Sequence, residues 1–117
     1  MALALVGTPY APRGASPETG FDCSGLVAYV YARALQLSVP RNTADLSRAG
    51  EPIAAADLRP GDLVFYNTQH RPFSHVGIYL GEMRFVHAPS SGGAVRLENM
   101  RVGYWTRRFD GARRITF

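Results

Sequence analysis

The single cysteine of this 117-residue chain, Cys23, stands in the stretch Phe21-Asp22-Cys23-Ser24-Gly25, directly before an apolar run. The run is long enough for a buried helix, and Asp22 is a typical N-cap residue, so Cys23 is expected in the first turn. The free N–H groups and the helix dipole there favour an anion, which would shift the thiol towards the nucleophilic thiolate. A lone cysteine is also often a small buried hydrophobe, so its position alone leaves both interpretations open.

Two of the three histidines border strand-like runs, at residues 75–80 and 83–87. His75 begins the first run and His87 ends the second, and each lies six residues from Gly81. A tight turn at Gly81-Glu82 would make these runs an antiparallel hairpin. The two histidines are then expected opposite each other, on one face and within hydrogen-bonding range.

This arrangement suits nucleophilic catalysis by a thiol. His75 would take the proton from Cys23, and His87 would fix the ring and the tautomer of His75. A single histidine at a strand end is more often an ordinary polar residue, but a mirrored pair together with a helix-first cysteine favours a site. His70 lies in a polar loop without such a partner and is expected to be exposed.

The surrounding pattern predicts helices first and an antiparallel sheet second, which is an α+β fold with segregated layers. A short helix is expected at residues 2–6, a loop at 10–20, a helix from 23 to about 37, and a second helix from Asn42 or Thr43 through Arg48. Gly25 would let another chain segment approach the cysteine. Strands are expected at residues 63–66, 75–80, 83–87, 94–97 and 113–117.

Length and composition narrow the class of protein. A length of 117 residues predicts one domain, residues 1–117, and a single cysteine excludes an internal disulfide. The net charge is +4 and all 13 basic residues are arginines, but they are scattered, which does not favour nucleic-acid binding. There is no apolar run long enough to span a membrane, and Met1–Val6 is too short for a signal peptide.

Four motifs appear in order along the chain: FDCSGLV at residues 21–27, PGDLVF at 60–65, SHVGIY at 74–79 and FVHAP at 85–89. Together with Thr8-Pro9-Tyr10 and Tyr104-Trp105, they resemble the NlpC-type (NlpC/p60) cell-wall cysteine peptidases over nearly the whole chain. The resemblance implies a papain-like α+β fold with N-terminal helices packed on an antiparallel sheet and the catalytic cysteine at a helix N-terminus.

The resemblance also implies roles for individual residues. Cys23 is the expected nucleophile, His75 the base and His87 the polar third member, with the Tyr10 hydroxyl near the thiol. The oxyanion is expected to bind the backbone N–H of Cys23 and the Tyr10 hydroxyl. The candidate substrate-binding residues are Arg13, Asp22, Ser24, Arg41 and Ser74.

The expected reaction is hydrolysis of peptidoglycan stem peptides, typically between γ-D-glutamate and a diamino acid such as diaminopimelate, with no cofactor. An amidase or acyltransferase using the same thiol and a non-catalytic wall-binding module are the alternatives. A zinc site of one Cys and two His is disfavoured because no close ligand pair is present. The protein is expected to be a monomer that acts in the periplasm or outside the cell, with any leader or targeting domain lying outside this chain.

Two departures from the family pattern fall on the substrate side. The family often has Trp-Gly-Gly after the tyrosine, where this chain has Pro12-Arg13-Gly14, and Leu46 stands where glutamine is common. An aromatic wall is thus exchanged for a cation, which is expected to change substrate preference and not the thiol chemistry.

Overall fold

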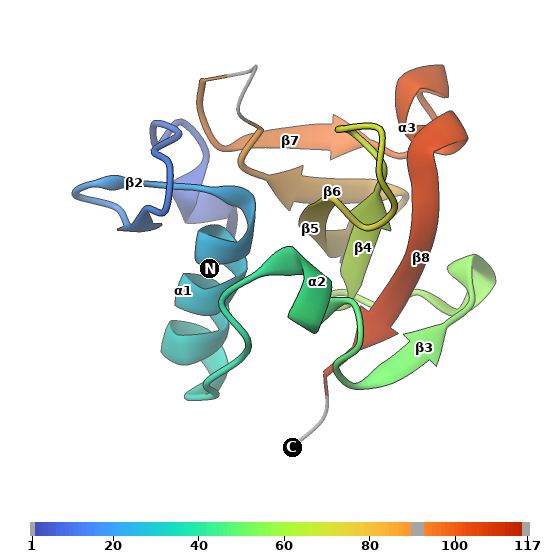
Figure 1. The fold of residues 1–117 in the computed structure, drawn as a ribbon, viewed down its shortest axis with the longest axis horizontal. Coiled ribbons are helices and arrows are strands. Elements are labelled where there is room, and N and C mark those ends of the chain that lie inside the picture. Colours follow the sequence, from blue (N-terminus) through green and yellow to red (C-terminus); the bar gives the residue numbers. More distant parts are fainter. Residues whose placement is uncertain (1, 90–92, 116–117) are drawn as a thin grey trace.

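The computed structural model describes residues 2–89 and 93–115 (Figure 1). The helices are η1 (Ala2–Leu5), α1 (Cys23–Leu35), α2 (Thr43–Leu46), η2 (Ala55–Asp57) and α3 (Gly103–Arg108), where η marks a 3-10 helix. The strands are β1 (Ala15–Ser16), β2 (Gly20–Phe21), β3 (Glu51–Ile53), β4 (Leu63–Tyr66), β5 (His75–Gly81), β6 (Arg84–His87), β7 (Arg96–Asn99) and β8 (Phe109–Arg114).

The main sheet has six strands in the order β3-β8-β4-β5-β6-β7, and every neighbouring pair is antiparallel. Helix α1 packs against it, chiefly on β5, and a small β1–β2 hairpin lies beside the start of α1 (Figure 1). The predicted α+β fold with a helix on an antiparallel sheet is confirmed. Strand β8, the last along the chain, lies inside the sheet between β3 and β4.

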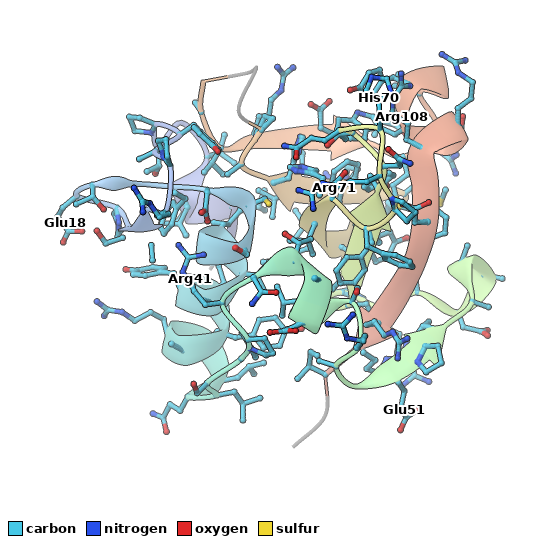
Figure 2. The ribbon with its side chains drawn as sticks, viewed as in Figure 1. Glu18, Arg41, Glu51, His70, Arg71 and Arg108 are labelled. Carbon is cyan, nitrogen blue, oxygen red and sulfur yellow. The ribbon has the colours of Figure 1, made fainter. Side chains whose placement is uncertain are left out.

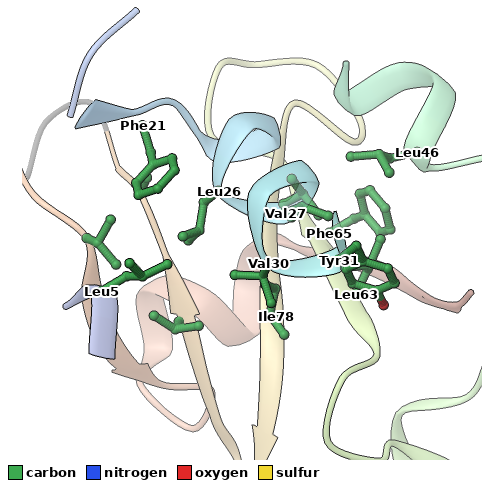
Figure 3. Packing of buried hydrophobic residues seen from close by; sticks show 14 residues of the cluster. Leu5, Phe21, Leu26, Val27, Val30, Tyr31, Leu46, Leu63, Phe65 and Ile78 are labelled. Atoms are coloured by element: carbon green, nitrogen blue, oxygen red, sulfur yellow. The ribbon is translucent and has the colours of Figure 1, made fainter. Parts of the chain in front are cut away.

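Both faces of the central strands are buried, which explains their continuous apolar runs. On β4, Leu63 and Phe65 pack towards α1, whereas Val64 and Tyr66 pack against a second cluster that contains Trp105 of α3. Figure 3 shows the first cluster, in which one side of α1 is held against the sheet. Helix α1 contributes Leu26, Val27, Val30 and Tyr31 to this cluster, none of them more than 8% exposed.

The boundaries of the helices and of the last two strands differ from the predicted ones. Helix α1 ends at Leu35 and not near residue 37, because Gln36 adopts the left-handed conformation and its N–H caps the carbonyl of Tyr31. Helix α2 is shorter than predicted and ends at Leu46. The last two predicted strands are also displaced: they lie at Arg96–Asn99 and Phe109–Arg114, and residues 116–117 lie outside the described residues.

Strand β3, helix α3 and the short β1–β2 hairpin, which lies in the predicted loop, were not predicted. Strand β3 contains Pro52, which a strand tolerates at the rim of a sheet, and β3 pairs with β8 alone. Within residues 2–89 and 93–115, no helix combines the length and the apolar character needed to cross a membrane.

Candidate active site

The first turn of α1 is built around Asp22. One of its carboxylate oxygens accepts from the backbone N–H of Gly25 at 2.7 Å, and the other accepts from the N–H of Arg13 at 3.0 Å. Arg41 lies beside this turn and donates to Asp22 at 3.1 Å and to Ser24 Oγ at 2.7 Å (Figure 2). Asp22 is therefore the N-cap, as predicted, and Cys23 is the first residue of α1.

The segment around Gly14 packs against the first turn of α1 because residue 25 is a glycine. A Cβ at that position would lie 1.9 Å from the carbonyl oxygen of Gly14 and 2.9 Å from Arg41 Nη2. The expectation that Gly25 admits a second chain segment is confirmed, since the Gly14 carbonyl occupies that space and also accepts from Arg41.

The thiol of Cys23 lies 3.8 Å from Thr43 Oγ1, at the start of α2. Burial raises the pKa of Cys23, and the hydrogen bond to Thr43 only partly opposes this. The predicted shift of the thiol towards thiolate is thus wrong, because desolvation by burial outweighs the effect of the helix N-terminus. Sequence reasoning missed Thr43 as a neighbour of the thiol, because the contact joins two helices.

His75 and His87 form a buried pair, with 2.7 Å between His75 Nε2 and His87 Nδ1. The prediction that the two histidines share one face and lie within hydrogen-bonding range is confirmed, but they do not lie directly opposite each other. The turn uses Glu82 and Met83, both with positive φ, and the strands pair Ile78 with Val86. Continued along the strands, this register sets His87 opposite Gly77, so the two histidines are diagonal neighbours on one face.

Gly77 makes the diagonal contact possible. A Cβ on Gly77 would lie 2.7 Å from the Phe85 ring and 3.3 Å from the Cβ of His87. Without a side chain there, the ring of His87 can reach towards His75 across the strand. Trp105 closes the pair from the other side, with its ring centroid 5.0 Å from that of His87.

Both histidines are neutral in the folded protein. Burial lowers the pKa of His75 to about 3, and the neighbouring His87 adds to the effect. Burial also lowers the pKa of His87 to about 3, with a smaller contribution from Arg96. His75 is therefore unprotonated at neutral pH, which is the state required of a base.

The shifted pKa values make the fold sensitive to acid. The unfolded chain binds protons on these histidines near pH 6.5 and the folded chain only near pH 3, so stability falls as the pH drops between those values. We expect the free energy of unfolding to fall by roughly 2 kcal/mol per histidine between pH 7 and pH 5.

Urea unfolding at both pH values measures this loss. A His87→Gln variant should show a smaller loss than the native chain, and exposed His70→Gln should show the native loss. Equal losses in all three proteins would contradict the assignment to the buried pair.

A third side chain, Glu98 of β7, extends the line of polar contacts from His75 through His87. His87 Nε2 lies 3.1 Å from Glu98 Oε2, and Arg96 Nε lies 3.0 Å from the same oxygen. The strand that carries Glu98 was predicted two residues too early, at residues 94–97, which left Glu98 outside it. Glu98 is thus a member of the polar cluster that sequence reasoning missed.

Two adjoining cavities meet at the thiol. A cavity of about 290 Å³ is lined by Tyr10, Cys23 and His75, with Trp105 among its other walls. A second, more open cavity shares Tyr10 and Cys23 with the first. It is lined by all five predicted substrate-binding residues, namely Arg13, Asp22, Ser24, Arg41 and Ser74.

Four of those five side chains, those of Asp22, Ser24, Arg41 and Ser74, are already engaged in holding the site together. Asp22 caps α1, and Ser24 donates to the carbonyl of Arg41 at 2.8 Å. Ser74 is buried and accepts from the backbone N–H groups of Thr68 and Gln69. Arg13 makes its contact to Asp22 through the backbone, which leaves its exposed guanidinium for a ligand.

Burial also raises the pKa of Tyr10, so its hydroxyl keeps its proton and can donate a hydrogen bond at neutral pH. His70 is exposed, as expected. In the part of the chain that the structure describes, no group of three or more His, Cys, Asp or Glu side chains is arranged to hold a metal ion.

The chain has the architecture of a papain-like cysteine peptidase, in which a thiol at a helix start faces histidines carried by an antiparallel sheet. A model of the NlpC/P60 family matches residues 7–114, and the chain belongs to that family.

Two curated relatives and one solved structure illustrate the likeness. Murein DD-endopeptidase MepH of Escherichia coli K12 is 41% identical over 113 residues, which cover 94% of this chain and 42% of that protein. The bifunctional muramidase/DL-endopeptidase CwlT of Bacillus subtilis 168 is 39% identical over 106 residues, 89% of this chain and 31% of that protein. A lipoprotein-like NLP/P60 family protein of Staphylococcus aureus Mu50 superposes with a TM-score of 0.87 at 37% identity, over 99% of this chain and 39% of that one. The chain spans less than half the length of each.

Proposed function

We propose that residues 1–117 form a single catalytic domain that hydrolyses peptidoglycan stem peptides. The observation that carries the proposal is the shared cavity of Cys23 and His75, with His75 hydrogen-bonded to His87 at 2.7 Å. The relatives named as murein DD-endopeptidase and DL-endopeptidase support the substrate class.

The reaction follows from the protonation states of the free site. His75 takes the proton of the Cys23 thiol as sulfur attacks the scissile carbonyl carbon. The backbone N–H of Cys23 and the protonated Tyr10 hydroxyl stabilise the developing oxyanion. His75 then returns the proton to the leaving amine, and water hydrolyses the thioester, again with His75 as base.

The bond that we propose is the one between γ-D-glutamate and a diamino acid. The cationic rim of the second cavity, formed by Arg13, Arg41 and Arg71, supports a substrate that carries carboxylates. The two relatives bear names for different bonds, DD and DL, so the products must be identified directly.

Mass spectrometry of purified peptidoglycan and defined stem peptides tests this proposal. Fragments that end in γ-D-glutamate, formed by the native chain and not by Cys23→Ala, are the expected result. Cleavage at the muramoyl–alanine bond would favour the amidase alternative, and transfer to an added amine would favour an acyltransferase. Binding without fragments would favour a wall-binding module.

Arg13 is the residue that we expect to contact a stem carboxylate. Replacing Arg13 with alanine should raise KM about tenfold and change kcat little, because the guanidinium binds a group remote from the reacting carbon. Steady-state kinetics on a defined stem peptide measures both constants. Arg101→Ala, which removes an exposed arginine outside the cavities, is the control. An unchanged kcat/KM in Arg13→Ala would exclude this contact.

We further propose that the domain acts as a monomer in the periplasm or outside the cell, where peptidoglycan lies. The names of the relatives support this location, and the match of residues 7–114 to one family model supports a single domain.

A further inference from the structure

Glu98 ends a continuous row of polar contacts that begins at the base. His75 Nε2 lies 2.7 Å from His87 Nδ1, and His87 Nε2 lies 3.1 Å from Glu98 Oε2. Arg96 pairs with the same oxygen at 3.0 Å. His87 is completely buried and the Glu98 side chain is 19% exposed, so solvent competes little for these contacts.

The sheet register brings Glu98 to this place. Strand β7 pairs with β6 so that Arg96 lies opposite His87 and Glu98 opposite Phe85. Residues two apart on a strand share a face, so Arg96, Glu98 and His87 all lie on one side of the sheet. Glu98 is therefore the diagonal neighbour of His87, just as His75 is on the other side.

The chemistry of the row permits one arrangement of protons. A carboxylate that is paired with an arginine is ionised and only accepts hydrogen bonds, so Nε2 of His87 must carry a proton. Neutral His87 then has a lone pair on Nδ1, which accepts from the N–H at Nε2 of His75. The proton of neutral His75 is thus on Nε2, and its Nδ1 is unprotonated.

The opposite tautomer of His87 would bring a nitrogen lone pair to 3.1 Å from the carboxylate oxygen in a buried place. It would also turn an N–H of His87 towards His75 and force the His75 proton onto Nδ1. His75 could then no longer take a proton from the thiol, because Nδ1 is the one ring nitrogen not engaged with His87.

We propose that Glu98 is a positioning residue that selects, through His87, the tautomer in which His75 presents an unprotonated Nδ1 to Cys23. The proposal concerns the same site as the proposed function and rests on it for the activity readout. Glu98 itself does not contact the thiol, and it does not line either of the two cavities that Cys23 lines.

Nitrogen-15 NMR of the imidazole rings tests the native protein directly. The chain has three histidines, and comparison with His70→Gln identifies the exposed one. At pH 7 we expect both His75 and His87 to be neutral with the proton on Nε2, whereas exposed His70 should show exchange between tautomers. A proton on Nδ1 of His87 or of His75 would overturn the proposal, whatever any variant does.

Two variants of Glu98 separate positioning from packing. Glu98→Gln keeps a carbonyl oxygen that can accept from His87, so it should retain the native tautomers and a kcat within about threefold of the native value. Glu98→Met removes the acceptor at similar size and should lower kcat at least about tenfold with little change in KM. Glu51→Gln is the matched control, since Glu51 lies on β3 at the opposite edge of the sheet (Figure 2).

The rate at which iodoacetamide alkylates Cys23 supplies a readout that needs no substrate, because the chain has one cysteine. We expect this rate to fall in Glu98→Met and to stay native in Glu98→Gln and Glu51→Gln. Native tautomers, alkylation rate and kcat in a folded Glu98→Met protein would overturn the proposal. If the native chain cleaves no peptidoglycan, the NMR and alkylation results still decide it, and the proposed function fails separately.

Discussion

Replacing Cys23 with alanine is expected to lower kcat/KM on a stem peptide by at least about 10,000-fold, to the limit of detection. The change removes the nucleophile, so no thioester can form, and no other cysteine in the chain can replace it. The thiol of Cys23 contacts the hydroxyl of Thr43 and the backbone of Val76 and Ser24, and the cap of α1 is made by Asp22, so loss of the thiol should leave that cap intact.

Release of fragments measured by mass spectrometry, with circular dichroism as the check on folding, decides this prediction. Thr43→Val is the matched control, because it removes the hydroxyl that contacts the sulfur but leaves the thiol, and it should retain most of the activity. Residual cleavage above about 1% of the native rate in folded Cys23→Ala would contradict a thioester mechanism.

The second large effect concerns stability. Gly25→Ala is expected to lower the free energy of unfolding by at least about 3 kcal/mol, because the new methyl group would collide with the backbone of Gly14. That collision cannot be relieved by a rotamer change, since both partners are backbone or fixed to it. The β1–β2 hairpin would have to move away from α1, which would break the contacts of Arg41 and of the Asp22 cap.

Urea unfolding followed by circular dichroism measures the loss. Gly103→Ala is the matched control: a Cβ there would meet only the flexible end of Arg107, and alanine favours a helix over glycine. We expect the control to change stability by less than about 1 kcal/mol. If both variants are equally stable, the close approach at Gly25 does not constrain this part of the fold.

The parts of the site that could be predicted depend on short-range signals. Asp22 and the apolar run that follows it determine where α1 begins, and the two strand-like runs around residue 82 determine a hairpin. These local patterns were enough to associate Cys23 with two histidines and to obtain the α+β class. The family resemblance then named Tyr10 and Arg41, and the departure from its pattern at residues 12–14 pointed to Arg13.

The parts that failed depend on long-range geometry. The turn at Glu82-Met83 requires two residues with positive φ that are neither Gly nor Asn, so the sequence favoured the turn one residue earlier. This shift moved His87 from opposite His75 to opposite Gly77. The charge state of the thiol was also misjudged, since how deeply a group is buried cannot be read from a helix start.

Glu98 was missed and β8 was predicted too late in the chain for a related reason. Strand β8 begins Phe109-Asp110-Gly111, which has little strand propensity, and it is held in place by pairing with β3 on one side and β4 on the other. Glu98 acquires a partner only through the β6–β7 register. The places of β8 and Glu98 are therefore set by pairing between strands that are distant in the sequence, and no periodic pattern in the sequence indicates them.

The place of β8 has a consequence for synthesis. Ribosomes make β3 and β4 first, yet these strands cannot complete the sheet until β8 arrives between them, with Arg114 then pairing with Asp62 at 2.9 Å. A nascent chain that has emerged only through β7 therefore exposes unpaired backbone along both β3 and β4, beside apolar side chains. Such a chain is a natural client for a holding chaperone, and a protein truncated before Phe109 should aggregate during translation.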